Sequence, residues 1–261
     1  MNKKNFTKGS GIAVLAAAVA LATAAPAVCS AGANAQIMAK AAEEDKKAEG
    51  MSLKTKTYEH EYKFKDGKIY KKLSFKYPSA EGDSEAAKTF NDYYKKLLKK
   101  WKKAAKENLA DAKELVLQRE DDVFYSDEVT CEIMQNDENY VSVLLSGYSY
   151  ELGAHGMPYR YADIFDAKTG KKLSAAKLLG LTKKQLNEKV RGLYLEQFDK
   201  DPESGFYPDR KDVETALNET DFNKNLYYLK DDKIYFYADP YLVGPYAAGF
   251  IEVSVDLEET A

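Results

Sequence analysis

Histidine and cysteine are scarce in this chain of 261 residues, which contains two of each. Because His60 and His155 are the only imidazoles, a metal site built from several histidines is excluded. The glycine-rich fingerprints of phosphate and dinucleotide loops and the Gly-x-Ser-x-Gly elbow of hydrolases are absent too. The sequence therefore predicts no cofactor, no metal ligands and no catalytic residues of these kinds.

Long apolar runs are rare, and the one that stands out extends from Gly11 to Val28. Three lysines precede it and small residues ending in Ala33-Asn34-Ala35 follow it, which is the three-part pattern of a secretory signal peptide. We predict that residues 1–35 are such a leader and that the protein is secreted or held at the bacterial cell envelope. The run is also near the ~18 residues that can cross a bilayer, so an uncleaved membrane anchor is the alternative.

The residues after the leader divide into a polar stretch and a longer part able to fold. Residues 36–50 are rich in Ala, Lys and Glu and cannot bury much apolar surface, so we predict a flexible linker. The roughly 210 residues that follow are many for one hydrophobic core and few for two independent domains. We predict two sublobes that share an interface, an N-terminal one at 51–170 and a C-terminal one at 171–257.

The exported part lacks an excess of basic charge and lacks a second cysteine. Removing the leader takes three of the 39 basic residues and none of the 42 acidic ones, so the net charge falls from −3 to −6. This balance argues against nucleic acid as a partner and is compatible with a basic protein partner.

Once the leader is removed, Cys131 is the only cysteine, so the hydrophobic core rather than an internal disulfide must hold the fold together.

The spacing of apolar residues predicts an α+β fold in which antiparallel sheets pack with two main helices. An Asp66-Gly67 turn between two strand-like arms, 53–64 and 68–77, indicates a β-hairpin. Apolar residues three and four apart over 84–120 indicate one long helix. A capping-box pattern, Thr182 with Gln185, starts the second. The remaining elements expected are an antiparallel meander over 123–166, a short helix at 211–217, a hairpin over 226–237 and a strand at 250–255.

Two loops carry residue types suited to binding. Leu152–Gly156 joins two strands and places two glycines around a lone histidine, and Asp239–Gly249 combines proline, glycine and tyrosine. A purely structural explanation is a tight first loop whose backbone needs positive φ, with His155 hydrogen-bonded locally, and a second loop whose tyrosines lie against the sheet edge. The functional explanation is that rigid tyrosines offer contact area at low entropy cost. The residues of this ligand-binding hypothesis are Gly153, Ala154, His155, Gly156, Pro240, Tyr241, Pro245 and Tyr246.

Three motifs in this chain point to a family. They are Tyr-x-Tyr-x-x-Gly-Ala-His-Gly at 148–156, Phe-Asp-x-x-Thr-Gly-Lys at 165–171, and Asp-Pro-Tyr-x-x-x-Pro-Tyr-Ala-x-Gly at 239–249. Over residues 54–256 the chain resembles the exported domain of unknown function shared by RsiV-type anti-sigma factors and PdaC-type peptidoglycan deacetylases. Family members often have glycine at the position of Leu152.

The resemblance implies a two-lobed, non-catalytic α+β ectodomain. In the anti-sigma members this domain binds lysozyme and so senses attack on the envelope, which implies a lysozyme-like protein or peptidoglycan as the partner. The short segment before the apolar run is too small to hold a sigma factor, and a polysaccharide deacetylase domain is lacking. We therefore expect a recognition module that stands alone.

Two further functions stay open at this point. A hydrolase that modifies the cell wall would need two carboxyl groups held across a sugar cleft, and acidic pairs such as Asp121-Asp122 and Asp127-Glu128 supply candidates. An accessory adaptor for a separate envelope protein needs no chemistry of its own.

Overall fold

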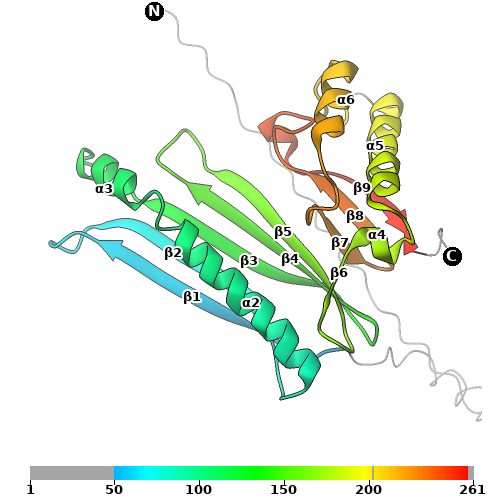
Figure 1. Ribbon diagram of the computed structural model, residues 1–261. Helices are drawn as coiled ribbons and strands as arrows, with labels where there is room; N and C mark the ends of the chain where they lie inside the picture. The colour runs from blue at the N-terminus through cyan, green and yellow to red at the C-terminus, as the bar shows by residue number, and fades with distance from the viewer. Residues whose placement is uncertain (1–49, 202, 258–261) are drawn as a thin grey trace, which may run out of the picture. The chain divides into compact units, whose positions relative to one another are not determined.

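A computed structural model describes residues 50–201 and 203–257, all within one compact unit. The predicted leader, 1–35, and residues 36–49 of the predicted linker lie outside the described residues. Among the described helices, none has the length and apolar character needed to cross a lipid bilayer. The structure confirms the α+β class: its strands form one six-stranded and one three-stranded sheet, with helices packed on both (Figure 1).

The six-stranded sheet has the order β1-β2-β3-β4-β5-β6. The predicted hairpin and meander are present, with antiparallel pairing between β1 and β2 and from β3 through β6. The β2–β3 pair is parallel, and the expectation of purely antiparallel sheets is wrong at this point. The physical reason is the connection between β2 and β3, which contains two helices. It carries the chain back to the end of the sheet at which β2 begins, so that β3 runs in the same direction as β2. The strands are β1 (Leu53–Lys63), β2 (Ile69–Ala80), β3 (Tyr125–Asn136), β4 (Tyr140–Tyr150), β5 (Met157–Asp166) and β6 (Lys172–Leu173).

The single long helix predicted over 84–120 is two helices, α2 (Glu85–Ala104) and α3 (Leu109–Leu117). Ser84 caps the first, since its hydroxyl accepts a hydrogen bond from the backbone N–H of Ala87. Between the helices, the Asn108 side chain accepts a hydrogen bond from Lys71 of β2. The break between the two helices therefore places the polar Asn108 side chain against the sheet. A continuous helix would have continued beyond this position.

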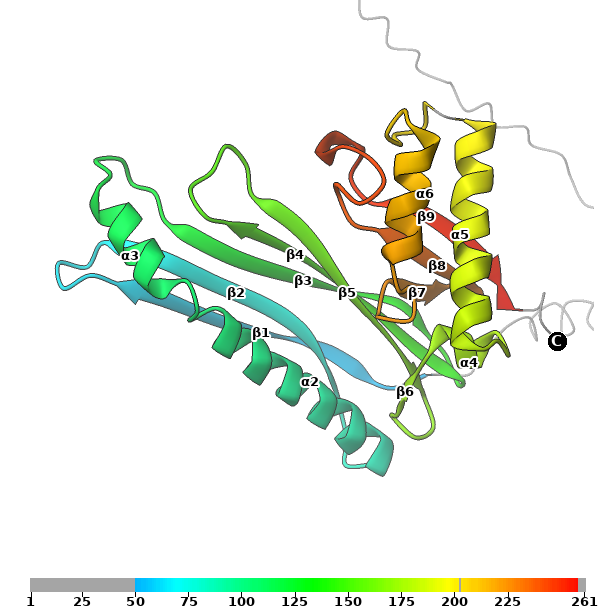
Figure 2. The ribbon, with the colours of Figure 1, turned by 45° about the horizontal axis from the view of Figure 1, so that its top comes forward.

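The C-terminal part begins with short α4 (Ala175–Leu178) and then α5 (Lys183–Lys200), whose predicted capping box is confirmed. Thr182 accepts from the backbone of Gln185, and the Gln185 side chain accepts from the backbone of Thr182. Helix α6 lies beside α5 (Figure 2). The elements that follow α5 are α6 (Arg210–Glu219), β7 (Tyr227–Lys230), β8 (Lys233–Ala238), the 3-10 turn η1 (Tyr246–Ala248) and β9 (Ile251–Asp256), with the sheet order β7-β8-β9.

Helix α2 covers one face of the six-stranded sheet. Phe90 and Tyr94 are buried against Phe165 of β5, with ring centroids 4.8 and 5.7 Å from its ring. Val143 and Leu145 of β4 belong to the same apolar cluster. The apolar helix face expected from the sequence is the one that packs on the sheet.

The other face of the six-stranded sheet packs against the three-stranded sheet. Leu144, which lies between Val143 and Leu145 on β4, and Ala162 of β5 cluster with Tyr228 and Tyr237. The far side of the three-stranded sheet packs against α5 and α6 in the largest apolar cluster of the described residues. The packing order is thus α2, the six-stranded sheet, the three-stranded sheet, and α5 with α6.

A buried ionic cluster ties these layers together. The carboxylate of Asp163 on β5 is 2% exposed; it pairs with Lys172 of β6 and accepts a 2.8 Å hydrogen bond from the Tyr93 hydroxyl of α2. Lys172 also donates to Asn225, which precedes β7, at 2.6 Å. One buried charge therefore joins α2, the six-stranded sheet and the segment that leads into the three-stranded sheet.

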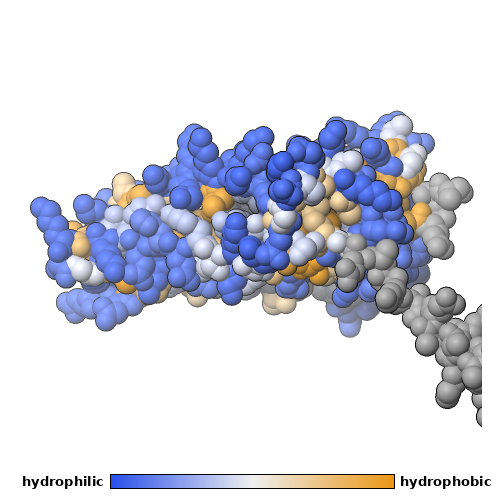
Figure 3. Space-filling view, turned by 90° about the horizontal axis from the view of Figure 1, so that it is seen from below, coloured by the Kyte–Doolittle hydropathy of each residue, from blue (hydrophilic) through white to orange (hydrophobic). Residues whose placement is uncertain are grey.

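The outer surface is mostly hydrophilic, in agreement with a composition in which 31% of the residues are charged. Seen from below, the molecule shows mostly hydrophilic residues with small, separated apolar areas (Figure 3). This distribution is typical of a face in contact with water.

Replacing Lys172 by Met would leave the Asp163 carboxylate buried without its cation. Removing one partner of a buried pair is strongly destabilising, and we expect Lys172→Met to lower the free energy of unfolding by about 3 kcal/mol. Urea unfolding followed by circular dichroism measures this change. Lys168→Met, at an exposed lysine in the preceding turn, is the matched control and should change the free energy by less than about 0.5 kcal/mol. Equal midpoints for the two variants would contradict the structural role of the cluster.

Candidate functional site

The two loops singled out in the sequence lie against each other in the structure. His155 of the β4–β5 loop has its Nε2 atom 3.5 Å from the Tyr241 hydroxyl of the β8–β9 loop. The Tyr246 hydroxyl donates a 3.1 Å hydrogen bond to the carbonyl oxygen of Gly156. The rings of His155 and Tyr246 lie 4.1 Å apart, between centroids, at 31°. Residues about ninety positions apart in the sequence thus form one contact surface.

We call the cluster of His155, Tyr148, Tyr241 and Tyr246 the loop patch. Tyr241 is 46% and Tyr148 39% exposed, and the rings of Tyr241 and Tyr246 lie 5.8 Å apart. The cluster therefore presents several aromatic rings to solvent from a small area.

The remaining residues of the ligand-binding hypothesis fall into two groups. Gly153, Ala154 and Pro245 are exposed beside the loop patch. Gly156 and Pro240 are buried, so they support the loops instead of offering surface.

The first loop contains a positive φ, as its structural explanation requires, but neither Gly153 nor Gly156 adopts it. Positive φ occurs instead at Leu152, 60°, and at Tyr241, 70°, where the left-handed region is unfavourable for a side chain. Gly156 is required for a different reason: a Cβ atom there would lie 2.4 Å from the Tyr148 ring and 2.6 Å from the carbonyl oxygen of Ser149. The backbone N–H of Gly156 donates to the Tyr148 hydroxyl at 2.7 Å, which needs this close approach.

One tyrosine of the loop patch, Tyr246, has a raised pKa. Desolvation by the neighbouring groups, followed by the effect of the Tyr148 and Tyr241 hydroxyls, raises the pKa of Tyr246. Its hydroxyl therefore stays protonated at neutral pH and acts as a hydrogen-bond donor. Across residues 50–201 and 203–257, no three acidic, histidine or cysteine side chains are grouped so that they could hold a metal ion.

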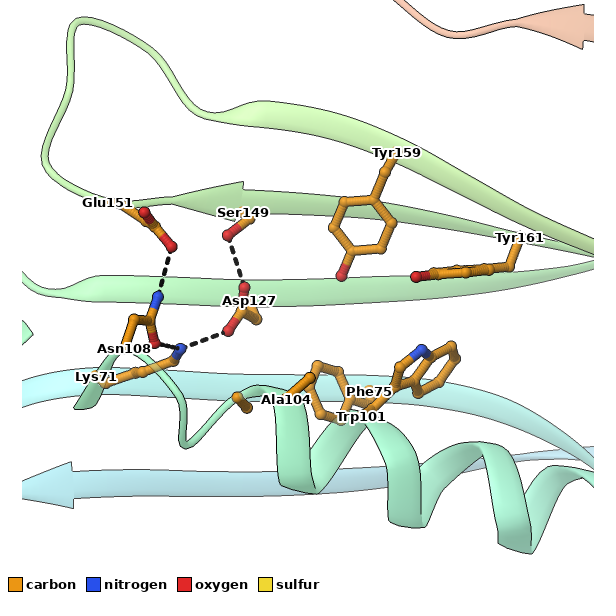
Figure 4. Close-up of a pocket in the computed structure, with 11 residues that line it drawn as sticks. Lys71, Phe75, Trp101, Ala104, Asn108, Asp127, Ser149, Glu151, Tyr159 and Tyr161 are labelled. Atoms are coloured by element: carbon orange, nitrogen blue, oxygen red, sulfur yellow. Dashed lines mark hydrogen bonds and ion pairs between the residues drawn. The ribbon is translucent and has the colours of Figure 1, made fainter. Parts of the chain in front are cut away.

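A second candidate site was missed in the sequence: a cavity of about 240 Å³ between α2 and the six-stranded sheet (Figure 4). Lys71 of β2, 1% exposed, lies at its base and pairs with Asp127 of β3 at 2.8 Å. Asp127 also accepts a 2.7 Å hydrogen bond from the Ser149 hydroxyl. Asn108 accepts from Lys71 at 2.6 Å and donates to the Glu151 carboxylate.

The sequence contains one signal of this cavity. In β2 the residues at 71, 73 and 75 point to the same face, because side chains alternate along a strand. Leu73 and Phe75 are buried there, so Lys71 is a charged residue on an apolar face. Such a lysine needs a buried partner, and the sequence alone does not show which carboxylate supplies it.

Substitutions at the two glycines of the β4–β5 loop test how tightly the loop patch is built. Gly156→Ala forces the new methyl group into the Tyr148 ring, so we expect the thermal midpoint to fall by several degrees and proteolysis to begin at this loop. Gly153→Ala is the matched control, because its Cβ would meet no atom closer than 3.5 Å and should leave both measurements unchanged. Equal behaviour of the two variants would show that the close approach at Gly156 is unimportant.

Comparisons with known proteins agree with the architecture. A DUF3298 family member from Bacteroides fragilis has a similar structure, with a TM-score of 0.57, 16% identity, and coverage of 82% of this chain and 93% of the other. A DUF3298 family protein from Pseudomonas aeruginosa has a TM-score of 0.54, 14% identity, and coverage of 80% and 91%. At such identities the likeness shows the fold alone. No curated protein matches the chain in sequence.

Two family models match consecutive parts of the chain. Residues 65–158 match the family described as "Deacetylase PdaC", and residues 163–258 match the one described as "Protein of unknown function (DUF3298)". The first range contains β2, β3 and β4 with the two helices between β2 and β3, and it holds the cavity residues except Tyr159 and Tyr161. The second range contains the three-stranded sheet and its helices. The resemblance read from the sequence is confirmed: this chain carries a PdaC domain followed by a DUF3298 domain, a domain of unknown function that it shares with PdaC-type proteins.

Proposed function

We propose that this protein is a non-catalytic binding module of the bacterial envelope that recognises a partner protein through the loop patch. The observation that carries the proposal is the contact between the two loops, which exposes rings of His155, Tyr241 and Tyr246 on one surface. Clustered tyrosines are typical of protein-binding surfaces because each ring contributes a large contact area with few torsions to fix.

The loop patch is pre-organised for such binding. Hydrogen bonds to Gly156 from Tyr246 and to Tyr148 from Gly156 hold the two loops before any partner arrives. Tyr241 is held in an unfavourable backbone conformation by the loop around it, including a 3.0 Å hydrogen bond from its N–H to the carbonyl oxygen of Gly244. Residues held in such conformations are concentrated at functional sites, which supports a binding role.

The charge of the surroundings favours a basic partner. An exposed carboxylate, Asp239, begins the second loop. The exported part carries a net charge of −6 if the leader is removed, since 36 basic residues then face 42 acidic ones. Complementary charge steers association and specificity more than it adds affinity. Together with the family resemblance, this makes a lysozyme-like protein the proposed partner.

Titrating the purified protein with lysozyme in a calorimeter tests the proposal. We expect a dissociation constant well below about 1 mM, and weaker binding at higher salt because part of the attraction is electrostatic. The double variant Tyr241→Asn/Tyr246→Ala should bind at least about tenfold more weakly, a loss of roughly 1.4 kcal/mol or more. Asparagine is chosen at 241 because it tolerates the left-handed backbone found there.

The control variant is Leu117→Asn on α3, which removes a 71% exposed apolar side chain outside the loop patch. Its affinity for lysozyme and the thermal midpoints of both variants should stay near those of the parent protein. Absence of binding by the parent at millimolar lysozyme, or equal losses in the double variant and the control, would refute the proposed function.

A further inference from the structure

The cavity between α2 and the six-stranded sheet has an aromatic wall. Trp101 of α2 lies 5.4 Å from the Phe75 ring and 5.9 Å from the Tyr161 ring, and Tyr159 lies 5.7 Å from Tyr161. Figure 4 shows the two tyrosines entering from β5 above the tryptophan and Phe75. The faces of aromatic rings carry negative charge density and attract the weakly positive C–H groups of a ligand.

The opposite part of the cavity is polar and has hydrogen-bonding capacity to spare. An ammonium group has three donors, and Lys71 uses two of them on Asp127 and Asn108 in the described part of the chain. Tyr159 and Tyr161 line the cavity, and their hydroxyls form no hydrogen bond within residues 50–201 and 203–257. Burial, with a contribution from Asp127, raises the pKa of Tyr159, so that this hydroxyl stays protonated.

A third observation concerns Trp101, whose buried indole Nε1 has no acceptor in the described residues. Buried polar groups are almost always hydrogen-bonded, so an exception at a cavity wall indicates a place where a partner is missing. In Figure 4 the indole nitrogen lies on the edge of the ring that faces Tyr161.

The polar groups are held in place before any ligand binds. Asp127 accepts from Lys71 and from Ser149, and Asn108 connects Lys71 to Glu151, so each of these side chains is fixed by at least one neighbour. Tyr159 is seated over Gly147 on β4, where a Cβ atom would come within 2.2 Å of its ring. Side chains that are already fixed by their neighbours lower the entropy cost of binding.

Charge and size narrow the class of ligand. Both signs of charge line the cavity: Asp127 and Glu151 would repel an anion, and Lys71 would repel a cation. At about 240 Å³ the cavity is smaller than the ~300–1,000 Å³ typical of sites for drug-sized molecules. Tyr161, 39% exposed, and the exposed Glu151 leave its mouth open to solvent. These features fit a small neutral ring with an apolar face and several hydroxyl groups, attached to a chain that continues outside.

We propose that this cavity binds one six-membered sugar ring of a saccharide, with its C–H face on the aromatic wall and its hydroxyls on Lys71, Asp127 and the two tyrosine hydroxyls. Each sugar hydroxyl both donates and accepts, as this mixed set of partners requires. The site is separate from the loop patch: Ser149 of β4 faces the cavity, whereas Tyr148 beside it faces the loops. The inference does not depend on the proposed function.

Trp101 is the only tryptophan of the chain, so its indole N–H gives a single reporter signal from the cavity wall. The full-length ¹⁵N-labelled protein is titrated with a tetramer of β-1,4-linked N-acetylglucosamine and, separately, with maltotetraose, while glycerol serves as a hydroxyl-only control. We expect a saturable shift of the indole resonance with at least one saccharide below about 10 mM and none with glycerol. The two saccharides distinguish a β-linked wall-type chain from an α-linked storage-type chain.

Two tyrosines with the same exposure, 39%, on opposite faces of the sheet supply matched variants. Tyr161→Ser should weaken saccharide binding at least about tenfold, and Tyr148→Ser should leave it within about twofold. Tyr159→Phe keeps the ring and removes only a hydroxyl, so a loss of about fivefold is expected. Thermal midpoints show that each variant is folded, and calorimetry confirms the affinities when a variant itself shifts the indole signal.

Several results would overturn the inference: no saturable shift with either saccharide, an equal shift with glycerol, or unchanged binding in Tyr161→Ser. Equal losses in Tyr161→Ser and Tyr148→Ser would also overturn it. Lysozyme binding by Tyr161→Ser remains at the parent level whether or not the cavity binds sugar, so failure of this inference and failure of the proposed function are distinguishable.

Discussion

Strands β4 and β5 are covered on both faces, and this constraint sets the rest of the structure. Because side chains alternate along a strand, each successive residue must suit a different layer. Leu145 meets α2, whereas Leu144 meets the three-stranded sheet. The same alternation sends Tyr148 to the loop patch and Ser149 to the cavity. A shift of one residue in the pairing register of β4 would move its side chains to the opposite face of the sheet. The residues of the loop patch and of the cavity would then change places, and charged groups would be buried in apolar layers.

Asp163 shows how such a doubly covered strand tolerates a charge. Its carboxylate is almost fully buried on β5, and its partners come from α2 and β6. A single apolar residue at this position would pack equally well against several arrangements of the layers. A carboxylate is satisfied only by the arrangement that brings Lys172 and Tyr93 to it, and an arrangement without them leaves a buried charge unpaired, which costs free energy.

Features governed by neighbours in the sequence could be predicted, and features governed by distant contacts could not. The capping box at Thr182 and the turn at Asp66-Gly67 need only a few adjacent residues, and both are present. The parallel β2–β3 pair and the break before α3 depend on tertiary contacts such as that of Asn108 with Lys71. The loops of the patch were identified from residue types, but the positive φ at Leu152 was not, since a leucine gives no sign of it. Glycine, which family members often have there, suits that conformation.

The parallel pairing of β2 with β3 has a consequence for how the chain reaches this structure. Lys71 pairs with Tyr125, so the two strands meet only after the whole segment containing α2 and α3 has been closed into a loop. The β1–β2 hairpin and the β3–β5 meander can each form from local contacts. Pairing β2 with β3 costs additional conformational entropy, because the segment between them must be closed into a loop. Because Lys71 and Asp127 come from strands on opposite sides of this junction, the cavity between α2 and the six-stranded sheet exists only in molecules in which the final pairing step is complete.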